Sequence, residues 1–516
     1  MAANTKASRY ILLPARGVRA VATNASPATA QFLSALHKQV GAAAKAAAPG
    51  APAVKVIESV HDDGAKLVEL KPAELAKLHA AQPGIRIVPE VFYYPAIAPR
   101  PVPIATPAGA KGAKTKGGKT IKAAGIAKAA KVPGASITFT VASKTGGTPI
   151  KGCTVVAFTD FANRIGAQGT TNAAGQVSLN LGASSKKIER LYVYARMSFW
   201  NGLKMNFTLT TGTTIKLVPI DLGYQDSLRH FYGNAPLTSG TSLKVGVIDT
   251  GISPEPNLVI QGGFNAVTGE NPNDFGDNGE GHGTHVAGII AARGTPPNGI
   301  RGLAPAVTLR SYRVFGKNKP GASNFDILKA LDRAVSDGCD LVNMSLGSQG
   351  SVDAATHDAI SHSRASGTLV FAAAGNDDRL PVGAPAKDPM ALAISALSRK
   401  GTYPSGSVEV GDVMGPFGTD PKNYITSFSD VGPEIDLTGP GDGIISTFPG
   451  GYAVMDGTSM ACPAALGAAA QLLAGQAAIL AMPRDQARSD AMAQFVLQKA
   501  KGLGFPPQLQ GQGMLS

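Results

Sequence analysis

The chain has 516 residues, 44% of them hydrophobic and 16% charged. This composition is typical of a soluble globular protein and excludes the disordered and collagen-like classes. At about 100–200 residues per domain, the length predicts about three domains. The formal net charge of +13 lies in residues 1–134, which hold 19 Lys and Arg against 6 Asp and Glu. The rest of the chain is balanced in charge, so the basic character belongs to the N-terminal part alone.

The chain has three cysteines, Cys153, Cys339 and Cys462, which lie far apart and form no CxxC pair. An odd number at this spacing indicates neither a disulfide framework nor a thiolate zinc site. We therefore expect buried free thiols, which agree with a reducing compartment. The basic N-terminus has no apolar stretch of the length that a secretory signal needs, so a cytoplasmic or unconventionally exported protein is expected.

One uncharged run, from Gly457 to Pro483, is long enough to raise the alternative of a membrane span. It consists mostly of Ala and Gly and contains Gln471 and Gln476. This composition favours a buried core helix over a transmembrane helix. No membrane contact is expected.

Residues 1–97 carry, from about residue 8, strand, strand, helix and strand signals in that order, which predict a small α+β domain. The signals are VKVIESV, AKLVEL, KPAELAKLHAAQPG and IRIVPEVFYYP. Residues 98–134 turn to Pro and then to Ala, Gly and Lys without an apolar face, so a flexible basic linker is predicted. Its lysines could contact a nucleic acid, but without interleaved aromatic residues a solvated tether is favoured.

Residues 135–222 hold short β-branched runs separated by Gly, Pro and Asn, which predict a small all-β sandwich. Residues 223–516 instead alternate apolar strand runs with helix-length segments. This pattern predicts an α/β domain with a mostly parallel sheet flanked by helices. Ser323 and Asp326 are placed to form a capping box at the start of one helix. In such sheets, ligands bind outside the carboxyl ends of the strands.

Several polar residues occur where this sheet is expected to bind a ligand. Asp249 and Asn376 come at the ends of two predicted strands, where their ordinary role is to form a turn or a cap. His282 precedes a helix with an apolar core face. His282 and His285 lie three residues apart and could share a metal, but no third ligand is evident nearby and the loop NDFGDNGEG lacks the EF-hand spacing.

Ser459, in the stretch DGTSMACPAALG, stands between a glycine-bearing turn and a small-residue helix. A helix cap and a nucleophile are compatible roles, because the amino end of a helix favours developing negative charge. A serine hydroxyl attacks well only when an imidazole accepts its proton. The imidazole needs a carboxylate partner, and the tetrahedral intermediate needs donors aimed at its oxygen. Asp249, His282, Asn376 and Ser459 supply these four groups.

The order of these residues, within VIDTGI, GHGTHVAG, AAAGN and GTSMACP, resembles the subtilisin-like serine proteases, and it is the chain order known for subtilisin itself. The resemblance covers roughly residues 243–513. It implies a subtilisin-like fold with Asp249, His282 and Ser459 as the catalytic triad. It implies that Asn376 donates to the oxyanion beside the backbone N–H of Ser459. It also implies that two extended segments line the primary specificity pocket, with the residues Ser345, Leu346, Gly347, Ala373, Ala374 and Gly375.

The chain departs from the family pattern just after the serine. The family usually reads Pro-His-Val-Ala-Gly, whereas here Pro463 is followed by Ala464, Ala465, Leu466 and Gly467. We expect altered packing of this helix and intact chemistry. By the same resemblance, Cys462 is interpreted as a small buried side chain and His285 as a structural helix residue.

Residues 1–97 are similar to the propeptide that chaperones and inhibits subtilases. The similarity implies that this part inhibits the active site of its own chain and that cleavage falls near Tyr94 to Ala98. Residues 135–222 resemble the small regulatory sandwich found beside some carboxypeptidases. For these residues, the roles of spacer, substrate-docking module and packing element stay open.

The resemblance implies a serine endopeptidase that hydrolyses peptide bonds through an acyl-enzyme and is made as an autoinhibited precursor. Two alternatives are a subtilase-type acyl transferase, such as a peptide ligase or cyclase, and an inactive protease-fold binding protein. Nothing in the sequence favours transfer, and the presence of all four site residues argues against an inactive fold. The chemistry requires no cofactor or metal, and structural calcium stays open, with DFGDNGE as the candidate loop. We expect a monomer that acts on proteins or peptides and binds no nucleic acid.

Overall fold

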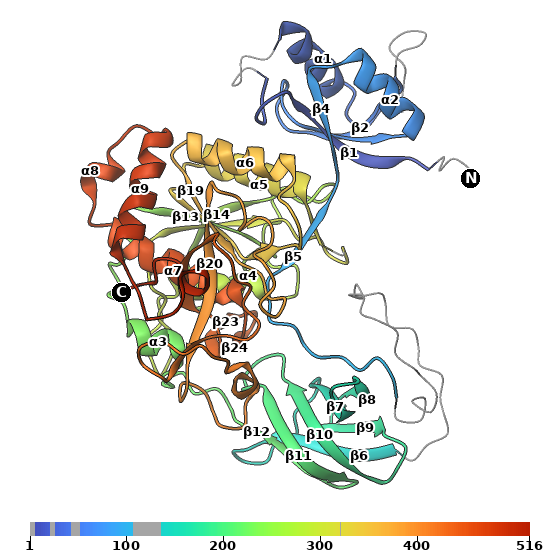
Figure 1. Cartoon of the computed structure of the whole chain (residues 1–516), viewed down its shortest axis with the longest axis vertical. Coiled ribbons are helices and arrows are strands. Elements are labelled where there is room, and N and C mark those ends of the chain that lie inside the picture. The colour runs from blue at the N-terminus through green and yellow to red at the C-terminus, as the bar shows by residue number, and fades with distance from the viewer. Residues whose placement is uncertain (1–5, 21–25, 43–51, 107–135, 320) are drawn as a thin grey trace.

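The computed structural model describes residues 6–20, 26–42, 52–106, 136–319 and 321–516. Three folded units lie one below another in Figure 1: an N-terminal unit in blue, a large α/β unit, and a β unit in blue-green. The β unit precedes the large unit in the sequence, yet the large unit lies between the other two. The chain therefore crosses the large unit between the N-terminal unit and the β unit.

The N-terminal unit is a four-stranded antiparallel sheet, in the order β2-β3-β1-β4, covered by two helices on one face. Its elements are β1 (Ser8–Pro14), α1 (Pro27–His37), β2 (Lys55–Ser59), β3 (Lys66–Leu70), α2 (Pro72–Ala81) and β4 (Ile85–Pro89). The sequence patterns did not predict α1. This helix is capped by Ser26, whose side chain accepts a hydrogen bond from the Thr29 N–H, but it buries only Leu33 and Leu36 among its large apolar residues. Two such positions make a weak periodic signal.

The two faces of the N-terminal sheet pack against different partners, because successive side chains of a strand point to opposite sides. Leu12 and Val68 belong to a core that includes the unit's own helices. Ile11, Leu13 and Leu67 belong instead to a core that lies mostly in the large unit. The N-terminal unit is therefore seated on the large unit by one whole sheet face.

The β unit is a sandwich of two sheets, in the orders β11-β10-β7-β8 and β12-β6-β9, around a common apolar core. Its strands are β6 (Ser136–Ser143), β7 (Thr154–Asp160), β8 (Ile165–Thr170), β9 (Gln176–Asn180), β10 (Ser185–Tyr194), β11 (Gly202–Thr210) and β12 (Thr214–Leu217). The sequence patterns did not single out β8 and β11. Strand β8 contains two glycines and β11 buries only two of its nine residues, so neither shows a strand-like apolar run.

Most of the predicted linker, residues 107–134, lies outside the described part of the chain. Residues 98–106 are described, and they extend from the large unit to the sandwich (Figure 1). At their far end, Ala105 forms a parallel bridge with Ile165, and the Ile104 N–H donates to the Arg164 carbonyl at 3.0 Å. This stretch is bound to the sandwich, whereas the sequence predicted a flexible linker here.

The large unit is built on an eight-stranded sheet in which the strands β14-β15-β13-β17-β19-β20-β21 follow one another and β22 pairs with β20. The pairs are parallel except that of β20 with β21. The strands are β13 (Lys244–Asp249), β14 (Ile260–Asn265), β15 (Thr308–Arg313), β17 (Leu341–Met344), β19 (Leu369–Ala373), β20 (Ala391–Arg399), β21 (Asn423–Ile425) and β22 (Ile435–Pro440). The sheet is thus mixed but mostly parallel, and the chain has an α/β fold here.

Helices cover both faces of this sheet, and each face has its own apolar core. One core includes α4 (His282–Ala291) and α7 (Thr458–Leu473). The other core includes α5 (Asn324–Ser336) and α6 (Ala354–Ala365), and it is the one that the N-terminal sheet joins. The remaining elements are β5 (Phe92–Pro95), α3 (Ser227–Tyr232), β16 (Ala322–Ser323), β18 (Leu346–Gly347), η2 (Val408–Asp412), β23 (Ile444–Phe448), β24 (Gly451–Met455), α8 (Ala477–Leu480), α9 (Gln486–Lys499), β25 (Ala500–Lys501), α10 (Pro507–Gln510) and β26 (Met514–Leu515).

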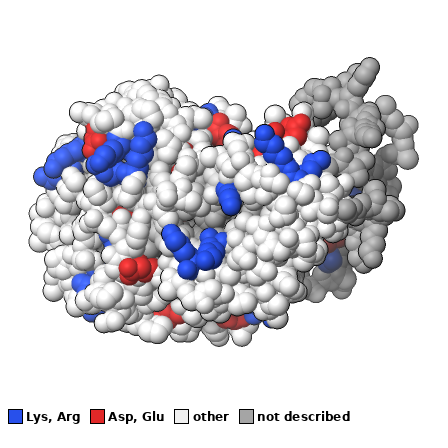
Figure 2. Space-filling view, turned by 90° about the horizontal axis from the view of Figure 1, so that it is seen from below, with Lys and Arg blue, Asp and Glu red and all other residues white. Residues whose placement is uncertain are grey.

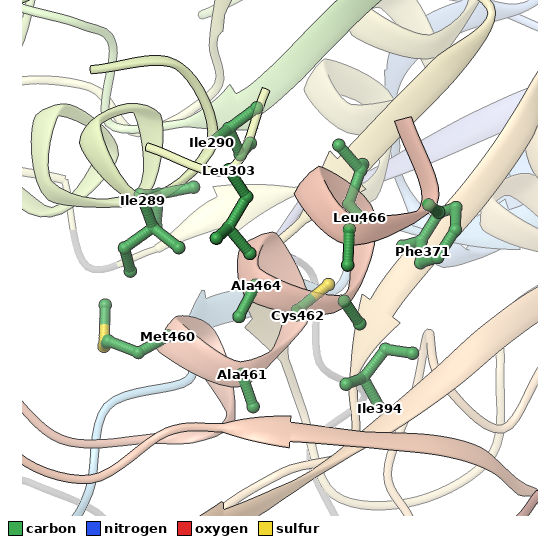
Figure 3. Packing of buried hydrophobic residues seen from close by; sticks show 14 of the residues in the cluster. Ile289, Ile290, Leu303, Phe371, Ile394, Met460, Ala461, Cys462, Ala464 and Leu466 are labelled. Carbon is green, nitrogen blue, oxygen red and sulfur yellow. The ribbon is translucent and has the colours of Figure 1, made fainter. Parts of the chain in front are cut away.

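Helix α7 is the small-residue helix that raised the alternative of a membrane span. It has 16 residues and is buried over nearly its whole length among apolar side chains of the large unit. Figure 3 shows Ala461, Cys462 and Ala464 in close packing with Ile289, Leu303 and Ile394 of the surrounding elements. In the described part of the chain, no helix combines the length and apolarity that a membrane crossing needs.

The sandwich is joined to the large unit by backbone hydrogen bonds and by one buried tryptophan. Trp200 is 1% exposed and belongs to a core of the large unit. Next to it, the Leu203 N–H donates to the Gly406 carbonyl at 2.8 Å, and the Val408 N–H donates to the Asn201 carbonyl at 3.1 Å. The sandwich is therefore part of one continuous structure with the large unit.

Figure 2 shows the molecule from below, which is the side of the sandwich in Figure 1. On the described residues of this face, Lys and Arg form small separate groups, and wide areas between them are uncharged. A binding surface for a polyanion requires a clustered basic patch. The described residues of this face do not form such a patch.

Candidate active site

Asp249 and His282 lie in contact at the carboxyl edge of the large sheet. Asp249 is the last residue of β13, and His282 is the first residue of α4. His282 Nδ1 lies 2.7 Å from Asp249 Oδ1, and both side chains are buried. His282 Nε2 is buried and makes no hydrogen bond within the described part of the chain. The arrangement therefore presents an imidazole nitrogen that is ready to accept a proton.

The glycine after His282 permits this contact. A Cβ atom at Gly283 would lie 2.4 Å from the Gly251 carbonyl oxygen and 3.0 Å from Asp249 Cβ. Any larger residue would push the start of α4 away from β13. The His-Gly sequence is thus required by the close approach of the helix to the end of the strand.

Ser459 is the second residue of α7, and its hydroxyl donates to the Ser345 carbonyl at 3.0 Å. The side chain is fully buried. Its hydroxyl therefore makes no hydrogen bond with His282 in this structure. Rotation about the Ser459 Cα–Cβ bond would redirect the hydroxyl away from Ser345.

Pro463 lies inside α7 and leaves the Ser459 carbonyl without its usual helical donor, because proline has no N–H. The Ser345 hydroxyl fills this place and donates to the Ser459 carbonyl at 2.8 Å. Ser345 therefore contacts Ser459 twice, once through its backbone and once through its side chain. Sequence reasoning assigned Ser345 to the specificity pocket and missed this second contact, although the proline four residues after Ser459 was a signal for it.

Asn376 follows β19, and its side-chain oxygen accepts a hydrogen bond from the Thr458 N–H at 2.8 Å. This bond fixes the orientation of the amide. Asn376 Nδ2 is buried and has no hydrogen-bond partner among the described residues. A buried donor without a partner is costly, so such a group is a candidate for binding a ligand or an intermediate.

The segment that follows the N-terminal unit lies directly against these residues. Strand β5 pairs antiparallel with β16 on one side and with β18 on the other. Beyond it, the Ala96 N–H donates to the Ser345 carbonyl at 3.2 Å, and the Ala96 carbonyl accepts from the Ser459 N–H at 3.1 Å. The Ala98 N–H then donates to the Asp456 carbonyl at 2.9 Å. An intact peptide chain therefore passes Ser459 with its backbone bound on both sides.

The residues expected to line a specificity pocket divide into two groups. Ser345, Leu346 and Gly347 contact this segment, since Leu346 pairs with Pro95 and Gly347 with Tyr94. Ala373, Ala374 and Gly375 instead contact other residues of the large unit. The Ala374 N–H donates to Ile394, and the Gly375 N–H donates to the Thr458 hydroxyl at 3.2 Å.

His285 and Cys462 lie close to the site but have structural surroundings. His285 Nε2 lies 3.0 Å from the Ile444 carbonyl, and burial lowers the pKa of His285 to about 3. Cys462 is fully buried in the apolar core, and burial raises the pKa of its thiol. Neither a protonated imidazole nor a thiolate is favoured at these positions.

The loop DFGDNGE, which was the candidate for calcium, uses its carboxylates for protein contacts. Asp277 accepts from the N–H groups of Gly279 and Gly281, at 2.7 and 2.9 Å. Asp274 lies 3.5 Å from Arg313 and 3.8 Å from Lys317. Among the described residues, no group of three or more His, Cys, Asp or Glu is arranged to hold a metal ion. The residues present do not fit a calcium site in this loop.

Comparison with known proteins places the large unit in a family. Residues 240–514 match the model of the subtilase family. The chain belongs to this family. Subtilisin BL of Lederbergia lenta is 38% identical over 227 residues, which are 44% of this chain and 74% of that protein. Alkaline elastase YaB of Bacillus sp. (strain YaB) is 40% identical over 227 residues, which are 44% of this chain and 53% of that protein.

A solved protease of Pseudoalteromonas arctica PAMC 21717 aligns with 57% of this subtilase chain and 96% of its own, at 23% identity and a TM-score of 0.46. The family and its relatives make this subtilase a subtilisin-like serine endopeptidase, a hydrolase of peptide bonds. The large unit, residues 223–516, is hereafter the protease domain. The prediction of a subtilisin-like serine endopeptidase, made from the sequence, is confirmed.

Proposed function

We propose that this subtilase is an autoinhibited precursor whose triad, Asp249, His282 and Ser459, first cleaves its own Ala96–Ile97 bond. One observation carries the proposal: the Ala96 carbonyl lies 3.1 Å from the Ser459 N–H, in a chain that is intact on both sides. A peptide carbonyl at the amino end of the nucleophile's helix is in the position of a substrate. Later substrates are other proteins and peptides bound in the same extended form.

The first step is attack of Ser459 Oγ on the carbonyl carbon of Ala96. The hydroxyl turns from the Ser345 carbonyl toward His282 Nε2, which accepts its proton. Asp249, bonded to Nδ1 at 2.7 Å, keeps the other proton on Nδ1 and stabilises the imidazolium ion.

The negative charge then develops on the carbonyl oxygen of Ala96. The Ser459 N–H already donates to this oxygen, and the unpartnered Nδ2 of Asn376 supplies a second donor. The bond between Ala96 and Ile97 breaks, and the Ile97 nitrogen leaves with the proton from His282. Water then attacks the acyl-enzyme, so that Ala96 is released as a carboxylate and Ser459 is restored.

The same contacts that make Ala96 a substrate make the N-terminal unit an inhibitor. Strand β5 occupies the groove between β16 and β18. Tyr93 in this strand is 1% exposed, and its hydroxyl donates to Asp353 at 2.7 Å. These contacts do not depend on the Ala96–Ile97 bond. After cleavage, residues 1–96 therefore stay bound and block the groove until they dissociate.

Mass spectrometry of the purified native chain and of the Ser459→Ala variant tests the proposal. We expect the native protein to yield a fragment that begins at Ile97, and the variant to remain one chain of full length. Ser363→Ala is a matched control, because Ser363 is a buried serine of α6 whose hydroxyl donates to the Ala359 carbonyl of the same helix. It should be processed like the native chain. A native chain that stays at full length, as Ser459→Ala does, would overturn the proposal.

A further inference from the structure

A cavity of about 560 Å³ lies between the sandwich and the protease domain, beside the chain that follows the proposed cleavage site. The proposed function makes no use of it. Its sandwich wall is aromatic, with the side chains of Phe161, Tyr192 and Tyr194. Its protease wall carries two half-buried acidic groups, Asp412 and Asp456. The cavity therefore has one aromatic side and one acidic side.

The chain's own residues 97–102 and Ile104 line this cavity, and the segment is held at both ends. Near Ser459, the Ala98 N–H donates to the Asp456 carbonyl. At the far end, Ala105 pairs with Ile165 of β8, and the Gly166 N–H donates to the Ala105 carbonyl at 2.9 Å. Strand β8 is the edge of its sheet, and an edge strand can accept any extended peptide through backbone bonds. The path from Ser459 to β8 is therefore a groove for an extended chain.

One side chain of the bound segment enters the space between the two walls. Arg100 is the fourth residue after the Ala96–Ile97 bond, and its guanidinium lies 4.5 Å from the centre of the Tyr194 ring. The charge of Arg100 also acts on Asp456, where it opposes the rise in pKa that burial causes. An arginine or lysine over an aromatic ring is favoured by the attraction between its charge and the face of the ring, and the ionised form of Asp456 adds a second attraction.

The basic side chains of the sandwich lie at a different place in the cavity. Arg190 and Arg164 stack on Phe161, with their guanidinium carbons 3.8 and 5.0 Å from its ring centre. These two arginines already make cation–π contacts with Phe161, which lies just before β8 in the sequence. Tyr194 stacks on Tyr192. The guanidinium over the Tyr194 ring comes from Arg100, a residue of the substrate-like segment. The position at Tyr194 is thus the one that the substrate must fill.

We propose that the sandwich is the leaving-group half of the substrate groove, and that it selects proteins with Arg or Lys at the fourth residue after the cleaved bond. The inference rests on the proposed function, because it takes Ala96–Ile97 as that bond. Trp200 and the backbone bonds around it fix the sandwich to the protease domain. Once residues 97–105 leave the groove, Tyr194 and β8 therefore keep their places and can bind another chain.

Two quenched fluorescent peptides test this selection on the self-processed native enzyme. One has the sequence of residues 92–104, and the other carries Arg100→Gln. We expect kcat/KM to be about five- to tenfold higher for the first peptide, as one partly desolvated cation–π contact predicts. A ratio within about twofold would overturn the proposal, and would mean that residues 97–105 merely pack there.

Variants of Tyr194 assign the selection to the sandwich. Tyr194→Ala should bring the ratio of the two peptides to about one, and Tyr194→Phe, which keeps the ring, should preserve it. Phe207→Ala is the matched control, because Lys204 lies 4.5 Å from the Phe207 ring in the same sandwich, outside the cavity. It should preserve the ratio. A ratio that is unchanged in Tyr194→Ala would overturn the proposal.

A third peptide, with the sequence of residues 92–98, separates this inference from the proposed function. It ends before the sandwich, so its cleavage by the native enzyme requires only the protease domain. Cleavage of this peptide together with equal rates for the two longer ones would overturn the inference alone. Cleavage of none of the three peptides would overturn both.

Discussion

The N-terminal unit and the sandwich are attached to the protease domain in opposite ways. The body of the N-terminal unit uses side chains: the apolar sheet face of Ile11, Leu13 and Leu67, and ion pairs around it such as His61 with Asp332. The sandwich uses its backbone and a shared core. Its residues pair with the segment around Ser407, and Trp200 enters the protease core.

The difference matches the two fates that we propose for these units. The body of the N-terminal unit meets the protease domain through side chains, so it can leave once the Ala96–Ile97 bond is cut and β5 separates from β16 and β18. Separation of the sandwich would expose a buried tryptophan and free backbone groups, and each of these costs free energy. The sandwich therefore stays as a part of the enzyme. Substitutions at either attachment test this difference.

The largest effect is expected at the sandwich junction, from Trp200→Ala. Trp200 is the only tryptophan of the chain and is 1% exposed. Its removal should lower the free energy of unfolding of the protease domain by about 3–5 kcal/mol, because it leaves a large cavity in a core of that domain. Circular dichroism in denaturant, measured in the Ser459→Ala background to prevent cleavage, checks this value.

Phe139→Ala is the control for this change. Phe139 is equally buried, but it lies in the inner core of the sandwich. It should destabilise the sandwich without shifting the protease domain. If Trp200→Ala also shifted only a separate transition of the sandwich, the two units would be independent domains, and the contrast with the N-terminal unit would fail.

The second effect concerns the tail of the N-terminal unit, from Tyr93→Ala. Tyr93 is buried in the groove and donates to Asp353. Its loss should weaken the binding of residues 1–96 to the processed enzyme by about 2–4 kcal/mol, as is typical of a central aromatic residue in an interface. Gel filtration of the processed enzyme after dilution should then show earlier separation of the fragment.

Tyr94→Ala is the matched control, because Tyr94 is the next residue and is 50% exposed. Its fragment should stay bound nearly as well as that of the native chain. Equal retention of the Tyr93→Ala fragment would mean that the tail contributes little and that the sheet face alone holds the N-terminal unit.

Much of the protease domain and its candidate site could be predicted from the sequence, because the signals are local. Asp249 stands at the end of an apolar strand, and His282 and Ser459 stand beside glycines at helix starts, so short stretches determine where each residue lies. Only one of the two hydrogen bonds of the predicted capping box forms. The Ser323 hydroxyl accepts from the Asp326 N–H, whereas the Asp326 side chain accepts from Thr268.

The contacts between units could not be predicted in the same way. Placing Ala96 at Ser459 depends on β5 pairing with β16 and β18, which are more than 200 residues away along the chain. The packing of Trp200 in the protease core and of Arg100 on Tyr194 likewise depends on tertiary structure. The resemblance to a subtilase propeptide implied inhibition and cleavage near Tyr94 to Ala98, but the contacts that make the two attachments are visible only in the structure.

The third effect is a pH dependence at the sandwich junction. Four acidic groups lie there, with Glu409 and Asp442 fully buried and Asp412 and Asp456 half-buried, and desolvation raises the pKa of each, that of Asp412 to about 8. In the unfolded chain these groups titrate near pH 4. Their neutral forms therefore stabilise the folded state fully below about pH 4, and this contribution is lost as the pH rises through the folded-state pKa of each group, which is about 8 for Asp412.

Asp412→Asn should recover part of that loss. Between pH 5 and pH 9, the free energy of unfolding should fall by on the order of 1–2 kcal/mol less in this variant than in the native chain, since the other three carboxyl groups still titrate. The emission of Trp200 reports the junction directly. Asp420→Asn is the control, because Asp420 is exposed and its pKa is lowered by the Lys422 N–H and by Arg399. An equal pH dependence in Asp412→Asn and the native chain would contradict the expectation.

The smallest effect should come from the charges between the N-terminal unit and the protease domain. His61 Nε2 lies 2.9 Å from Asp332, but the His61 side chain is 32% exposed. Partly exposed ion pairs contribute about 0–1 kcal/mol and are screened by salt. Asp332→Asn, or 0.5 M NaCl, should therefore weaken the binding of residues 1–96 by less than about fivefold. Glu69→Gln, which removes a pair with Lys55 inside the N-terminal unit, is the control. A loss as large as that from Tyr93→Ala would show that charges hold this unit, and its attachment would then depend on salt in a way that the sandwich junction does not.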